Sequence, residues 1–148
     1  MKRYLLGIAF LLVISGIVGC SGEKKSREAV VYYVDDKTGE VLTKAVETSN
    51  ESDVWKELQN TGVLTEDCQL ISFEINEESE SIILDFNDET GKWIRSMGTT
   101  GEIQIIGCIV NTFLDTYGCN EIQLTEEGNL LDSSHGADYS GYMRHIAF

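Results

Sequence analysis

"TTGEIQIIGCIVNTFLDTYG", residues 99–118, is the strongest helix signal in this chain. It opens with a capping-box pattern, Thr99 followed three residues later by Glu102, and Gly118 is a typical C-terminal stop. At about 100° per residue, the apolar side chains fill roughly half of the circumference. They are Ile103, Ile105, Ile106, Ile109, Val110, Phe113, Leu114 and Tyr117, and the other half holds Gln104, Gly107, Asn111 and Asp115. A stripe this wide predicts a helix that lies on a sheet at the centre of the core.

A β-hairpin is predicted directly upstream of this helix. "QLISFEIN", residues 69–76, and "SIILDFN", residues 81–87, both alternate apolar and polar residues, and an acidic turn joins them. The predicted core face carries Ile71, Phe73 and Ile75 from the first strand and Ile82, Leu84 and Phe86 from the second.

Weaker signals complete the order of elements. Residues 29–34, "AVVYYV", and residues 40–47 predict a first hairpin with a turn at 35–39. Ser52 is the predicted N-cap of a short helix that ends near residue 60, and residues 119–125 predict a further strand. The order β-β-α-β-β-α-β predicts a single α+β domain, with a mixed or antiparallel sheet of about four to six strands and two helices on one face.

The N-terminus carries the features of an export signal. Lys2 and Arg3 precede an apolar run over residues 4–18, which is shorter than the roughly 20 residues of a membrane-spanning helix. The run ends in Ile17-Val18-Gly19-Cys20, which resembles the lipobox of bacterial lipoproteins. This resemblance implies a signal peptide at 1–19, lipidation of Cys20, a tether over 20–28 and a domain over 29–148. The predicted location is the cell membrane, with the domain outside the cytoplasm.

The charge of the chain is strongly negative, with 25 acidic and 11 basic residues and a net charge of −14. Such a chain repels nucleic-acid phosphates, so nucleic acid is excluded as a predicted partner. The expected contacts are the membrane through the lipid on Cys20, and either an envelope protein or a second copy of the chain.

Three cysteines remain once Cys20 is assigned to lipid. Cys108 and Cys119 are eleven residues apart on the predicted helix, about 16 Å along its axis, which excludes a disulfide between them. A pair between Cys68 and Cys119 stays open, beside the alternative of three packed thiols.

Candidate catalytic or metal-binding residues are few. The segment from Asp85 to Gly91 has a calcium-loop appearance but lacks the required residues at later positions. The C-terminal segment holds the residue types of a hydrolase triad within thirteen residues and lacks a GxSxG motif; these are Ser133, Ser134, His135, Asp138, Ser140 and His145. No catalytic residue, metal or cofactor is therefore predicted, and a small envelope enzyme or a thiol or metal module is the alternative.

The lipobox, the hairpin at 69–87 and the passage at 98–124 together resemble the GerMN domain of sporulation and spore germination. The matching motifs are Leu84-Asp85-Phe86, then Gly101 and Glu102 leading into the helix with "IVNT" at 109–112, and the turn glycines Gly118 and Gly128. The resemblance implies a lipid-anchored, extracytoplasmic binding or assembly module of a Gram-positive bacterium, and not an enzyme.

Overall fold

The computed structural model describes residues 26–132 and 135–148. The elements are β1 (Arg27–Val34), β2 (Val41–Thr48), α1 (Glu51–Asn60), β3 (Leu70–Asn76), β4 (Ser81–Phe86), α2 (Asp88–Ser96), α3 (Gly98–Tyr117), β5 (Glu121–Glu126) and β6 (Asn129–Leu130). The predicted α+β class is confirmed. No helix within the described ranges is long and apolar enough to cross a bilayer. The predicted signal peptide and Cys20 lie outside the described residues, so both stay predictions.

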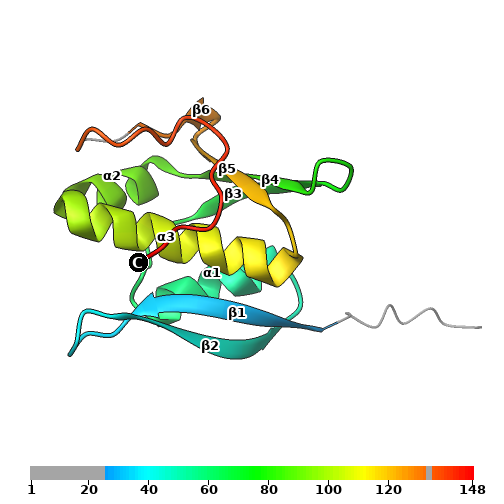
Figure 1. Cartoon of the computed structure of the whole chain (residues 1–148), viewed down its shortest axis with the longest axis horizontal. Coiled ribbons are helices and arrows are strands. Elements are labelled where there is room, and N and C mark those ends of the chain that lie inside the picture. The colour runs from blue at the N-terminus through cyan, green and yellow to red at the C-terminus, as the bar shows by residue number, and fades with distance from the viewer. Residues whose placement is uncertain (1–25, 133–134) are drawn as a thin grey trace, which may run out of the picture.

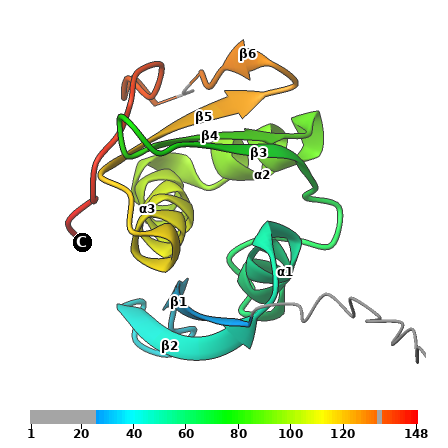
Figure 2. The same cartoon turned by 90° about the vertical axis from the view of Figure 1, so that its right-hand side faces the viewer.

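The strands form two sheets, one on each side of α3 (Figure 1, Figure 2). β1 and β2 make a two-stranded antiparallel sheet, and the other sheet has the order β3-β4-β5-β6. β4 and β5 are parallel, joined by a connection that contains α2 and α3, while the other pairs in this mixed sheet are antiparallel. The N-terminal hairpin does not extend the larger sheet; it packs on α3, where the Tyr32 backbone N–H donates to Thr112 Oγ1 at 2.9 Å.

Helix α2 was not predicted, and the sequence explains why. Its nine residues bury only Thr90, Gly91 and Ile94, so no apolar stripe is present. The helix forms because Asn87 caps its N-terminus and two acidic residues occupy its first turn. The structure therefore has three helices in the described residues, one more than predicted.

The predicted starts of the other two helices were wrong. The side chain of Asn50, not Ser52, caps α1 by accepting from the Asp53 backbone N–H at 3.0 Å. Helix α3 begins at Gly98 directly after α2 without a side-chain cap, so the capping box at Thr99 does not form. The predicted stop is confirmed, since Gly118 ends α3 with a φ of 68°, a left-handed conformation that favours glycine.

Helix α3 is the centre of the core, as predicted. Part of the half of the helix that was predicted to be polar is also buried. Gly107 and Asn111 lie on the predicted polar half and are buried beneath the C-terminal segment. The Asn111 amide binds both the backbone N–H and the carbonyl of Ile146, each at 2.9 Å. Gly107 leaves room for the ring of Phe148, which a Cβ would meet at 2.5 Å.

The hairpin of β3 and β4 is confirmed, with one difference in its core face. Ile82, Leu84 and Phe86 are fully buried. Ile71 is 53% exposed and Ile75 40% exposed, because β3 is the edge strand and its register shifts between residues 70 and 72.

Candidate functional site

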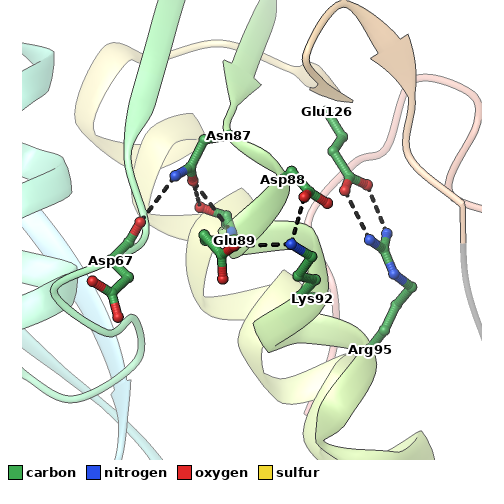
Figure 3. Close-up of polar contacts among 8 residues, drawn as sticks. Asp67, Asn87, Asp88, Glu89, Lys92, Arg95 and Glu126 are labelled. Atoms are coloured by element: carbon green, nitrogen blue, oxygen red, sulfur yellow. Dashed lines mark hydrogen bonds and ion pairs between the residues drawn. The ribbon is translucent and has the colours of Figure 1, made fainter.

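A polar cluster joins the start of α2 to its neighbours; we call it the α2 junction. It comprises Asp67, Asn87, Asp88, Glu89, Thr90, Lys92, Arg95 and Glu126 (Figure 3). Asn87 Oδ1 accepts from the backbone N–H of Gln69 at 2.9 Å and from that of Thr90 at 3.2 Å. It also accepts from Thr90 Oγ1 at 2.7 Å, while Asn87 Nδ2 donates to the Asp67 carbonyl at 2.9 Å. One side chain thus ties α2 to the loop before β3.

Two ion-pair groups complete the α2 junction. Lys92 Nζ lies 2.6 Å from Asp88 and 2.8 Å from Glu89, and the Lys92 hydrogen bond lowers the pKa of Asp88. Arg95 binds both oxygens of Glu126, at 2.6 and 2.7 Å, and this contact raises the pKa of Arg95. The Lys92 pairs lie within α2, whereas the two-bond contact between Arg95 and Glu126 joins α2 to β5.

Glycine at position 91 makes the Arg95–Glu126 pair possible. The Glu126 carboxylate passes directly over the Gly91 backbone, where a Cβ would collide with it. This explains the glycine inside a short helix, where it costs about 1 kcal/mol relative to alanine.

The two histidines of the C-terminal segment contact different ends of α3. His135 Nδ1 lies 2.8 Å from the buried Glu102, and His145 Nε2 lies 2.7 Å from Asp115. The two carboxylates are thirteen residues apart, about 20 Å along the helix. Asp115 also accepts from the Tyr32 hydroxyl at 2.7 Å, which raises the pKa of Tyr32 to about 12.

Two of the other triad candidates, Asp138 and Ser140, bind each other. Asp138 accepts from the backbone N–H of Ser140 at 2.9 Å and from its hydroxyl at 2.6 Å, which lowers the Asp138 pKa and closes a local turn. Ser133 and Ser134 lie outside the described residues. The described part of the segment therefore shows structural contacts with α3 and within itself.

Asp85 belongs to the sheet and not to a calcium loop. Its carboxylate accepts from Thr125 Oγ1 at 2.6 Å and from the Gly128 backbone N–H at 2.8 Å, and it is 9% exposed. The segment 85–91 is the end of β4 and the start of α2. Within residues 26–132 and 135–148, no three His, Cys, Asp or Glu side chains are grouped to hold a metal ion.

The three described cysteines are free and buried, which favours packed thiols over a Cys68–Cys119 disulfide. Burial raises the pKa of Cys108 to about 12 and also raises that of Cys119. Protonated thiols are poor nucleophiles and poor metal ligands.

A hollow of about 250 Å³, which we call the Trp93 hollow, opens where several elements meet. It is lined by Val34, Asp36, Thr61, Gly62, Val63, Trp93, Met97, Gly101, Gln104 and Ile105. Trp55, by contrast, is 4% exposed and stacks in the core on Phe86. The wall of the hollow is more apolar than polar, and the hollow is open to the surface.

Residues 21–132 match the Germane family, described by its role in sporulation and spore germination. The chain belongs to the Germane family. This confirms the GerMN resemblance read from the motifs. The match includes the α2 junction, which is thus part of the Germane domain of this chain.

Solved structures share the fold of this Germane domain at low sequence identity. The first GerMN domain of the sporulation protein GerM from Bacillus subtilis has a TM-score of 0.55 and 16% identity, covering 76% of this chain and 95% of that one. The tandem GerMN domains of the same protein give 0.57 and 14%, covering 79% and 46%. A candidate lipoprotein from Clostridium perfringens gives 0.50 and 18%, covering 80% and 87%.

One curated relative has a different description. The ribosomal RNA small subunit methyltransferase G of Alkaliphilus metalliredigens is 27% identical over 92 residues, which are 62% of this chain and 38% of that protein. This chain spans less than two fifths of that relative's length, so we infer no methyltransferase activity for it from this similarity.

Proposed function

We propose that this protein is a lipid-anchored extracytoplasmic module that binds or assembles partners in the cell envelope, without catalysis, during sporulation or spore germination. The match of residues 21–132 to the Germane family carries the proposal. The lipobox-like Ile17-Val18-Gly19-Cys20 supports the anchor, as does the fold shared with a candidate lipoprotein.

The polar side chains support a binding role over a catalytic one. Asn87 and Arg95 join α2 to other parts of the sheet layer, and Asp85 holds the turn after β5. The two histidines hold the C-terminal segment on α3. These groups stabilise the fold. None of them lines the Trp93 hollow, which is therefore available for binding.

The anchor is tested by lipid labelling of the whole chain in a spore-forming Gram-positive host. Wild type and the neighbouring control Ser21→Ala should incorporate radioactive palmitate and sediment with membranes. Cys20→Ala should do neither, because it lacks the thiol that the lipid modifies. Equal labelling of Cys20→Ala would contradict the anchor.

The binding role is tested with residues 21–148, which keep the whole buried core from Ala29 to Tyr139. We expect either association in sedimentation velocity that persists in reductant, or a specific envelope protein recovered by cross-linking. A monomer that captures nothing from envelope extracts would overturn the binding role.

A further inference from the structure

We propose that the Trp93 hollow receives one large apolar side chain from a positively charged segment of a partner polypeptide. This inference rests on the proposed binding function and names the surface and the chemistry of the partner. The hollow lies at the junction of the β1–β2 turn, the end of α1, and helices α2 and α3.

The hollow is held open by long-range hydrogen bonds on two sides. Gln104 Nε2 of α3 donates to the Gly39 carbonyl in the β1–β2 turn at 2.9 Å. Trp93 Nε1 of α2 donates to the Val63 carbonyl after α1 at 3.0 Å. Because both rims are fixed before anything binds, a partner loses little free energy in ordering them.

The volume and the apolar lining of the hollow indicate which kind of group can bind in it. About 250 Å³ is below the roughly 300–1,000 Å³ of small-molecule sites, and suits one large side chain. Apolar side chains supply most of the wall, from β1, from the segment after α1, from α2 and from α3. Trp93 is half-buried, so its ring is available as one wall for an aromatic or long aliphatic side chain.

The negative charge around the hollow indicates that the partner segment carrying this side chain is basic. Asp36 is the one charged residue of the lining; it is exposed and makes no ion pair within the described residues. A second hollow that also includes Trp93 in its lining contains Asp67, Glu89 and Lys92, and Lys92 is already paired with Asp88 and Glu89. With a net charge of −14, the chain attracts a basic segment and repels a second copy of itself.

The test titrates residues 21–148 with the acetylated, amidated peptide Lys-Lys-Phe-Lys-Lys and records amide and indole NMR shifts. We expect saturable shifts at Gly62, Gly101, the Gln104 amide and the Trp93 indole. The peptide with Ala in place of Phe should bind at least about tenfold more weakly, as expected for losing a buried aromatic side chain. Equal binding of the two peptides, or shifts elsewhere, would overturn the assignment.

Charge is tested with Asp36→Lys and the matched control Glu47→Lys. Both sites are exposed on the β1–β2 hairpin, at opposite ends, and both variants change the net charge equally. At low salt Asp36→Lys should weaken the Phe peptide at least about threefold, and Glu47→Lys less than about twofold, because the Coulomb interaction falls with distance and screening. Equal effects would overturn a specific role for Asp36.

The outcomes separate this site from the proposed function. If an envelope partner or self-association is found while the peptide does not bind and Asp36→Lys changes neither, the function stands and the site assignment falls. If concentration alone shifts the same resonances, the occupant is a second copy and the basic-partner assignment falls. If the peptide binds as expected but the chain finds no envelope partner, the site stands and the proposed function falls.

Discussion

Replacing Asn87 by alanine should cost far more than replacing a typical helix cap. The side chain makes four hydrogen bonds: it accepts two from Thr90 and one from the Gln69 backbone N–H, and it donates one to the Asp67 carbonyl. Loss of the cap costs about 1 kcal/mol, and each of the two bonds to the loop before β3 adds about 0.5–1 kcal/mol. The expected loss of unfolding free energy for Asn87→Ala is therefore about 2–3 kcal/mol.

Asn50→Ala is the matched control, because Asn50 caps α1 through a single bond to the Asp53 backbone. It should cost about 1 kcal/mol. Asn87→Asp keeps the acceptor oxygen and loses only the donor to the Asp67 carbonyl, so it should cost about 0.5–1 kcal/mol, clearly less than Asn87→Ala.

Urea unfolding of residues 21–148, followed by tryptophan fluorescence, measures these differences, since Trp93 lies on α2. In a separate thermal melt, the melting temperature should fall by roughly 3–6 °C for each kcal/mol of unfolding free energy lost. If Asn87→Ala and Asn50→Ala agree within about 0.5 kcal/mol, the bonds to the loop before β3 contribute nothing, and the account of the α2 junction is refuted.

Three further predictions concern α3. Phe113→Ala should lose about 3–5 kcal/mol in urea unfolding, because the ring is fully buried against other aromatic rings. Gly107→Ala should destabilise the protein by about 1–3 kcal/mol in thermal melts because its Cβ meets the Phe148 ring. The same change in a Phe148→Ala background should be neutral or stabilising by up to about 1 kcal/mol, and equal effects in both backgrounds would contradict the contact. Burial raises the pKa of Cys108 from 9.0 to about 12, so the unfolded thiol ionises first and stability should fall as pH rises through this range. Cys108→Ala should flatten that part of the profile of unfolding free energy against pH, and an unchanged slope would count against the burial argument.

Elements with strong apolar periodicity were predictable from the sequence. Most of the predicted stripe of α3 is buried, although Ile103 near its start is 39% exposed, and the apolar residues that alternate along β4 are fully buried. Helix α2 was not predictable in this way because most of its side chains are polar and its stability comes from Asn87 and from ion pairs. Its N-terminal Asn-Asp-Glu signal was the available cue.

Contacts between distant segments account for what the sequence did not predict. Asn111 and Ile146 are 35 residues apart, and periodicity cannot indicate that a polar helix face will be covered by a later segment. The Trp93 hollow needs the Gln104–Gly39 contact, across 65 residues, and its lining comes from separate elements. The residue types of the site were visible in the sequence, but their proximity was not.

The position of β1 has a mechanical consequence for a tethered protein. The strand begins at Arg27, seven residues along the sequence from the proposed lipid anchor at Cys20, and ends about 25 Å away at Val34, which lines the Trp93 hollow. Tension between membrane and partner would run along β1, nearly perpendicular to the hydrogen bonds that join it to β2 over its whole length. Those bonds would be loaded in shear together with the Tyr32 contact to α3, and would not be broken one after another. The domain would therefore transmit a pull from one end of β1 to the other while staying folded.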